Sequence, residues 1–217
     1  MLRRVFLLVG PVAGLGAGQA WAQATLRPDP TPRLPPQPGQ GLPADDMRFL
    51  RDARALSTAQ AEAAARVAQG GADEETRRFA EGLAERHRRL AQEIASQARQ
   101  HGLPGAAQAT GDAPGGRVAE ALQRLAGLGG AAWSGGDLGR AYLATQLEVH
   151  PVLVEMYQTE ASHTTDRDLG RLAITTLVWI QEDFATAARL GARHGLAPPD
   201  RLLTNPPQYG PGAGPRR

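Results

Sequence analysis

The sequence of 217 residues contains no cysteine and no lysine. Without cysteine the chain forms no disulfide, offers no thiol nucleophile and carries no lipoprotein anchor. Without lysine it can use neither Schiff-base chemistry nor a catalytic lysine, and it cannot build the lysine-containing loop that holds phosphate in many nucleotide-binding proteins. Several large enzyme classes are therefore excluded before any motif is considered.

Aromatic residues make up only 5% of the chain. Alanine and leucine are abundant, which favours closely packed helices over a sheet. The sequence pI of 9.6 suggests a nucleic-acid partner at first. However, two of the 24 basic residues lie within the first 22 positions, while all 22 acidic residues follow, so the remainder carries 22 basic against 22 acidic side chains. No excess of positive charge is left to neutralise phosphates, and we expect no nucleic-acid binding.

The first 22 residues have the pattern of a secretory signal peptide. Arg3 and Arg4 precede an apolar stretch from Val5 to Ala13, and Ala20-Trp21-Ala22 forms a cleavage signal with small residues at its ends. The apolar stretch is too short to span a bilayer, and no later run reaches roughly 20 apolar residues. We therefore expect export to a bacterial periplasm or secretion, with no transmembrane helix in the mature chain.

Proline and glycine divide the rest of the chain. Residues 23–44 are dense in proline, which prevents regular structure and predicts a flexible linker. Residues 197–217 have the same character and are expected to form a disordered tail. One domain remains, at residues 45–196.

Apolar residues recur at helical spacing in four long segments of this domain. The segments run from Asp45 or Asp46 to Gln69, from a cap at Asp73 to Gln100, from Leu138 to Ser162, and from a cap at Thr165 or Asp166 to about His194. The first and second are joined by a short turn, as are the third and fourth, whereas a long connection containing a short helix at 117–128 separates the pairs. Two antiparallel hairpins joined by one long crossover predict an all-α, ferritin-like four-helix bundle.

The two hairpins end alike, in Arg99-Gln100-His101-Gly102-Leu103-Pro104 and in Arg193-His194-Gly195-Leu196-Ala197-Pro198. This similarity is either a weak trace of duplication or two independent uses of a good helix stop. In both sequences a histidine stands where the helix dipole favours positive charge. We assign neither histidine a catalytic role.

Each long helix places one polar residue on its apolar face: Gln60, His87, His150 and Asp183. If they met at one level, His87, His150 and Asp183 could bind a single divalent metal ion such as Zn, Cu or Fe, with Glu62 as a weaker candidate ligand. The alternative is a buried hydrogen-bonded layer in which Asp183 holds a charged or tautomer-fixed histidine. Glu62 lies off the apolar face, which favours solvation. The aromatic residues Trp133, Tyr142, Trp179 and Phe184 are expected to fill the core.

A full di-iron site is not expected. Ferritin-like bundles that bind two metals use a Glu-x-x-His motif on two helices, and here the corresponding positions hold Ala84 and Leu147. Pro151, directly after His150, removes one helical hydrogen bond and is expected to kink its helix. We see no serine-histidine-acid spacing and no glycine-rich phosphate loop in the sequence.

Two segments resemble a bacterial exported family catalogued as domain of unknown function 4142. Arg78-Phe79-Ala80 through Glu85-Arg86-His87 is similar to the family's "FA…DH" helix, and Arg140-Ala141-Tyr142 through Glu148-Val149-His150 is similar to its "AY…H" helix. The resemblance covers about Asp46 to Leu196 and implies export, a ferritin-like bundle and an unknown biochemical role. The chain departs from the family where Gln60 replaces a common glutamate and where Leu177-Val178 and Asp183 replace an "LP…H" pattern.

The sequence thus favours an exported helical bundle of the cell envelope that acts as a binding or stress-related module without catalysis. Its partner would be an envelope protein or peptidoglycan. The alternative is a ferritin-like protein with divalent-metal-binding or oxidoreductase-like activity, which would use the inward histidines and Asp183.

Overall fold

The computed structural model describes residues 41–103, 114–129 and 135–198. These residues form five α-helices and no strand: α1 Ala44–Gln69, α2 Glu74–Gln100, α3 Gly116–Gly127, α4 Gly135–His163 and α5 Arg167–Arg193. Each helix begins and ends within three residues of its prediction, and the all-α bundle is confirmed. The predicted signal peptide, the linker up to residue 40 and the tail from residue 199 lie outside the described residues.

Aspartates begin two of the long helices: Asp73 as predicted, and Asp166 rather than the alternative Thr165. The Asp73 carboxylate accepts the backbone N–H of Thr76 at 3.0 Å, and the Asp166 carboxylate accepts the backbone N–H groups of Asp168 and Leu169. Each carboxylate satisfies amides that have no partner within the helix. Helix α1 has no side-chain cap, but Asp45 and Asp46 lie in its first turn, where negative charge is favourable.

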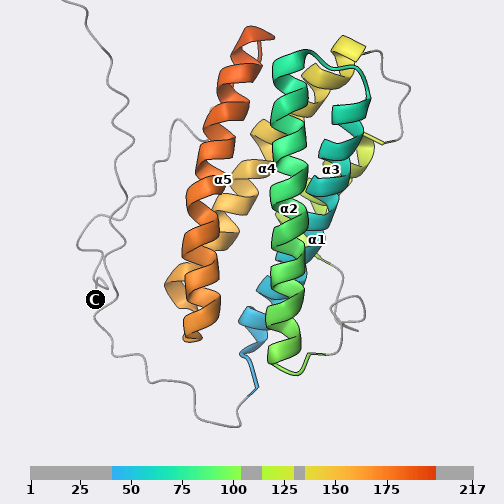
Figure 1. Ribbon diagram of the computed structural model, residues 1–217. Coiled ribbons are helices and arrows are strands. Elements are labelled where there is room, and N and C mark those ends of the chain that lie inside the picture. The colour runs from blue at the N-terminus through green and yellow to red at the C-terminus, as the bar shows by residue number, and fades with distance from the viewer. Residues whose placement is uncertain (1–40, 104–113, 130–134, 199–217) are drawn as a thin grey trace, which may run out of the picture.

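The helices form two hairpins that pack side by side (Figure 1). Helix α1 packs along α2, and α4 packs along α5. Helix α2 ends at the bottom of Figure 1, whereas α4 begins at the top, so the connection that contains α3 runs the length of the bundle. Helix α3 packs against α1 and α4 on the way. This is the long crossover predicted from the spacing of the helical segments.

The similar ends of the hairpins adopt the same local structure. Gly102 and Gly195 have φ of 71° and 70°, in the left-handed region. The following N–H of Leu103 reaches back to the carbonyl of Ala98, and that of Leu196 reaches back to Gly191, each at 2.9 Å. This is the Schellman arrangement, in which glycine avoids the strain that a Cβ would add.

Small and branched apolar side chains fill the interior. Alanines and leucines from all five helices are buried, and Tyr142 and Tyr157 are the largest fully buried side chains. Alanine allows the helices of each hairpin to approach closely, so the polar groups between them are shielded from water. Helix α4 continues through Pro151 without a break.

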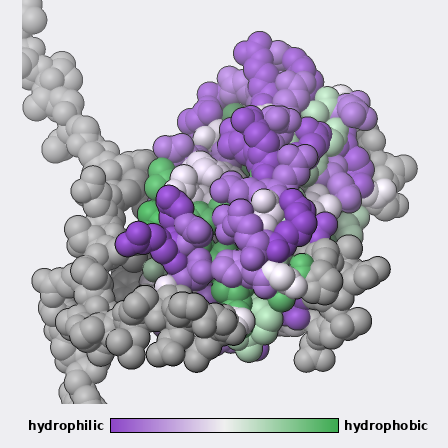
Figure 2. All heavy atoms as spheres, turned by 60° about the horizontal axis from the view of Figure 1, so that its bottom comes forward, coloured by the Kyte–Doolittle hydropathy of each residue, from purple (hydrophilic) through white to green (hydrophobic). Residues whose placement is uncertain are grey.

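The face of the molecule at the bottom of the bundle is mainly hydrophilic. Figure 2 brings the bottom of the bundle forward and shows polar residues over most of that face, with hydrophobic residues in small patches. Among the described helices, none combines the length and the apolar character needed to cross a membrane.

Candidate functional site

A polar layer crosses the middle of the bundle core. Gln60, His87 and His150 are all 0% exposed, so the prediction that they point inward is confirmed. The side-chain amides of Gln60 in α1 and Gln146 in α4 exchange two hydrogen bonds of 2.9 Å. Sequence reasoning missed Gln146, although it lies one helical turn before His150 and therefore on the same face. This amide pair links the two hairpins.

The imidazole of His150 is held in one tautomer. Its Nδ1 lies 3.0 Å from the backbone carbonyl oxygen of Gln146. A carbonyl oxygen only accepts, so Nδ1 carries the hydrogen and Nε2 presents a lone pair. That Nε2 is buried and has no hydrogen-bond partner among the described residues. Burial lowers the pKa of His150 to about 4, with Arg86 adding to the decrease and the Gln146 hydrogen bond opposing it.

The imidazole of His87 has still fewer polar neighbours. Neither ring nitrogen makes a hydrogen bond within the described part of the chain. The ring meets Trp179 of α5 edge-on, with centroids 5.2 Å apart. Burial, together with smaller contributions from His150 and Arg86, lowers the pKa of His87 to about 3. Both imidazoles are therefore neutral at physiological pH.

Asp183 is held by an arginine and by neither histidine. The Arg86 guanidinium in α2 makes two hydrogen bonds to the Asp183 carboxylate in α5, one of them 3.1 Å long. The expectation that Asp183 orients a histidine is therefore wrong, because Arg86 takes both carboxylate oxygens. Burial raises the pKa of Asp183 to about 6, and Arg86 opposes this increase. Arg86 escaped sequence reasoning because it precedes His87 and lies at the edge of the apolar face.

The predicted metal ligands do not form a complete coordination site. Within residues 41–103, 114–129 and 135–198, no group of three or more His, Asp or Glu side chains is placed to hold a metal ion. Asp183 is engaged by Arg86, and Glu62 is exposed on α1. The carboxylate-rich donor set of a di-iron ferritin-like site does not fit these residues. What remains are two neutral imidazoles with free nitrogens.

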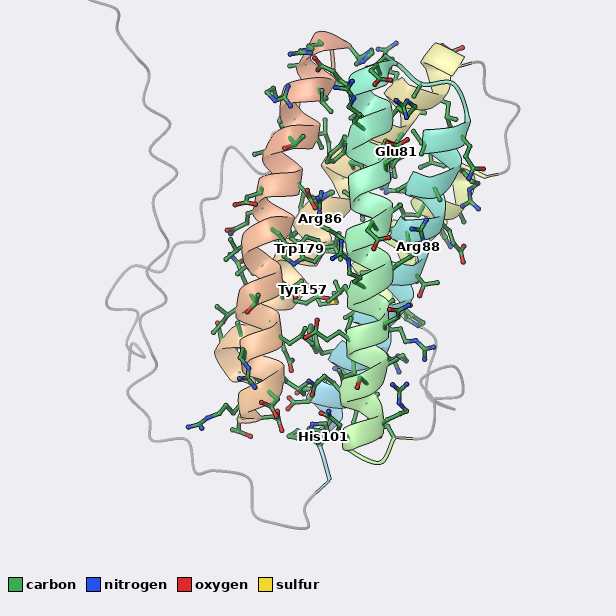
Figure 3. The ribbon with its side chains drawn as sticks, viewed as in Figure 1. Glu81, Arg86, Arg88, His101, Tyr157 and Trp179 are labelled. Atoms are coloured by element: carbon green, nitrogen blue, oxygen red, sulfur yellow. The ribbon has the colours of Figure 1, made fainter. Side chains whose placement is uncertain are left out.

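A groove lies on the surface between α2 and α5, which we call the seam groove. It has a volume of about 530 Å³. Arg86 and Trp179 both point into the space between these helices, whereas Arg88 points away from it (Figure 3). Its lining residues are Arg86, Arg89, Leu90, Glu93 and Gln97 from α2, and Asp168, Arg171, Leu172, Thr175, Thr176 and Trp179 from α5. Trp179 packs against the core as expected, in contact with the buried His87, and it also lines the groove.

Polar contacts tie α2 to α5 at both ends of the seam. At one end His101 Nε2 lies 3.5 Å from the Asp166 carboxylate, and at the other His194 Nε2 lies 3.4 Å from the Asp73 carboxylate. Each contact joins the residue that caps the start of one helix to the histidine that ends the other. The seam groove lies between the Arg86 contact with Asp183 and the end contact of His101.

A second buried carboxylate lies near the bottom of the bundle. Glu160 of α4 is 5% exposed, and its Oε1 has no hydrogen-bond partner among the described residues. Burial, with smaller contributions from the charges of Asp46, Asp166 and Asp45, raises its pKa to about 8. Asp46 itself accepts the hydroxyl of Thr164 at 2.8 Å. Sequence reasoning missed Glu160, although it follows Tyr157 by one helical turn.

The comparisons with known proteins identify a family and no closer relative. The family model described as domain of unknown function (DUF4142) matches residues 31–190. No curated protein matches the chain, and no solved structure matches it.

Proposed function

The chain belongs to the family described as domain of unknown function (DUF4142). From that premise we propose that the protein is an exported binding module of the cell envelope and that it performs no catalysis. The seam groove is the binding site in this proposal. The amino-terminal pattern of Arg3, Arg4 and the apolar stretch after them supports export to the periplasm or beyond. The partner is an envelope component, either a protein or peptidoglycan.

The two core histidines have properties that favour a function without catalysis by either of them. A general acid or base must reach its substrate and should titrate near the working pH. His87 and His150 are fully buried, and burial holds their pKa values at about 3 and about 4. They have neither the access nor the pKa that proton transfer at neutral pH requires.

The observation that carries the binding proposal is the seam groove itself. Its volume of about 530 Å³ lies in the range of ligand sites in proteins. Leu90 and Leu172 give it a buried apolar floor, while charged and polar side chains converge from two helices. The lining is therefore mainly charged and polar around a small apolar floor, which suits a polar partner.

Two adjacent arginines of α2 provide a matched test of this site. Arg89 lines the groove and Arg88 does not, yet each is more than half exposed and each pairs with Glu85. The mature chain is sedimented with purified peptidoglycan and used in pull-downs from an envelope fraction. We expect Arg89→Ala and Trp179→Ala to reduce the bound fraction, while Arg88→Ala binds like the wild type. Equal binding by all variants, or no binding at all, would contradict the proposal.

Export has its own test. Fractionation of producing cells, followed by amino-terminal sequencing, should recover the protein outside the cytoplasm with a new terminus near Gln23. Recovery in the cytoplasm with residues 1–22 still present would contradict export.

One observation favours a second candidate, in which the core binds one metal ion such as Zn, Cu or Fe. His150 donates Nδ1–H to a backbone carbonyl and leaves Nε2 free, as metal-ligating histidines generally do. His87 adds a second neutral imidazole, and the buried hydroxyl of Tyr142 also has no hydrogen-bond partner among the described residues. Buried polar atoms left without partners call for a bound water or ion.

Elemental mass spectrometry of protein purified without chelator, then titrated with Zn, Cu and Fe, tests this candidate. Near-stoichiometric metal that is lost in a His87→Ala/His150→Ala double variant would support it. Asp183→Asn is the matched control, because Arg86 rather than a histidine holds that carboxylate. An absence of metal from both the wild type and the double variant would contradict it.

A further inference from the structure

The arginines that line the seam groove already have carboxylate partners, although Arg89 shares Glu85 with Arg88. Each of its three arginines pairs with a carboxylate: Arg86 with Asp183, Arg89 with Glu85 and Arg171 with Asp168. A guanidinium that keeps such a partner has less capacity to attract an anionic ligand. The groove is therefore not a ready anion site, despite its arginines.

Among the described residues, two that line the groove from α2 carry acceptor oxygens without a partner, Glu93 and Gln97. Within the described part of the chain, Glu93 makes no ion pair of the kind that holds its arginine neighbours, and its side chain is exposed. The Oε1 of Gln97 is buried and has no hydrogen-bond partner there. Glu93 and Gln97 are four residues apart, so both lie on the face of α2 that lines the groove. A ligand that satisfies them must donate N–H or O–H groups.

The apolar part of the groove lies within reach of these acceptors. The contacts of Arg86 with Asp183 and of His101 with Asp166 fix the antiparallel register of α2 against α5. That register places Glu93 opposite Thr175, one helical turn or about 5.4 Å along the axis from Trp179. An indole ring attracts a cation over its face. A positive charge beside Glu93 would therefore lie near the aromatic surface too.

We propose that the seam groove binds a small organic cation, a primary ammonium carried on a short apolar stem. The ammonium donates to the exposed Glu93 carboxylate, and the stem packs on Leu90, Leu172 and Trp179. This inference rests on the proposed function, because it assigns ligand chemistry to the same site. A free diamine and the side chain of a lysine-containing peptide share this chemistry.

Three probes of equal length and different charge test the ligand class: pentane-1,5-diamine, pentane-1,5-diol and glutarate. Each is titrated into the isotopically labelled mature chain and followed by NMR. We expect the diamine to shift the amide resonances of residues 86–97 and 168–179, and to bind more weakly as salt is raised. The diol and glutarate should bind at least fivefold more weakly. A fourth titration, with a blocked lysine and its norleucine counterpart, asks whether a peptide side chain is accepted.

Variants connect the binding to named side chains. Glu93→Gln should weaken diamine binding about two- to fivefold, the range for a solvent-exposed ion pair. Trp179→Leu should weaken it by a similar factor. Arg88→Ala, on the other side of α2, should bind like the wild type. The melting temperatures of all three variants show whether each one is folded.

The outcomes separate this inference from the proposed function. Preferential binding of the diamine that depends on Glu93 supports the inference. Equal or tighter binding of glutarate or the diol in the groove overturns the ligand class, while the groove remains a binding site. If none of the probes binds, the inference is overturned, and the sedimentation experiment with Arg89→Ala and Arg88→Ala then decides separately whether the groove binds an envelope component.

Discussion

Replacing His87 by leucine should make the protein more resistant to acid. The folded protein holds His87 with a pKa of about 3, whereas the ordinary value is 6.5. The unfolded chain therefore binds more protons between these two pH values, and stability falls as the pH falls through 6.5. At pH 4.5, two units below 6.5, this linkage costs about 2.7 kcal/mol of unfolding free energy.

The lowered pKa of His150 also reduces the unfolding free energy as the pH falls. Its pKa of about 4 in the folded state adds a loss of about 2.5 kcal/mol at pH 4.5. Together the two histidines remove about 5 kcal/mol, a large part of the 5–15 kcal/mol typical of a folded protein. Asp183 and Glu160 act in the opposite direction because their pKa values are raised, so the informative quantity is the difference between variant and wild type at each pH.

Urea unfolding followed by circular dichroism at pH 7.5 and 4.5 measures that difference. At pH 7.5 we expect His87→Leu to be as stable as the wild type or more so, since it removes two buried nitrogens without partners. At pH 4.5 its advantage should grow by about 2–3 kcal/mol. His163→Gln is the control, because His163 is exposed. If the difference between His87→Leu and the wild type is the same at both pH values, the reasoning is refuted.

Three further predictions concern other buried or capping groups. Glu160→Gln should gain stability over the wild type as the pH rises from about 5 to 8, since the raised pKa of Glu160 means that its deprotonation opposes folding; constant differences in urea midpoint would contradict this. Arg86→Met should cost about 1–3 kcal/mol by leaving the Asp183 carboxylate without its partner, and Asp183→Leu should restore part of the loss in a double-mutant cycle. Asp73→Ala should lower the unfolding free energy by about 1 kcal/mol through loss of the cap on Thr76, as chemical denaturation would report; an unchanged value would show that the cap is dispensable.

The periodicity of the sequence was sufficient to predict the helices and which face of each is buried. Phe79, Leu83, His87 and Leu90 recur at steps of three and four, and all four are buried. The turn residues were equally informative: Asp73 and Asp166 begin helices, and Gly102 follows the end of one. These features depend on local backbone chemistry, so a sequence without any homologue reveals them.

The partners of the buried groups could not be predicted in the same way. Asp183 was assigned to the histidines because all lie on apolar faces, yet Arg86 reaches it from the rim of α2. Periodicity gives the direction of a side chain around its own helix, but not the axial register between two helices. For the same reason the sequence did not reveal the seam groove, whose lining comes from α2 and α5 in a register fixed by contacts such as that of His101 with Asp166.

Hydrogen exchange of the mature chain, with and without purified peptidoglycan or an envelope-protein fraction, tests the proposed binding site most directly. Bound partner should slow exchange in residues 86–97 of α2 and 168–179 of α5, which line the seam groove. Arg89→Ala should weaken this protection and Arg88→Ala should preserve it. Protection confined to α1 or α3, or no change with peptidoglycan and with an envelope-protein fraction alike, would contradict the account of this bundle as a module that binds an envelope component in the seam groove.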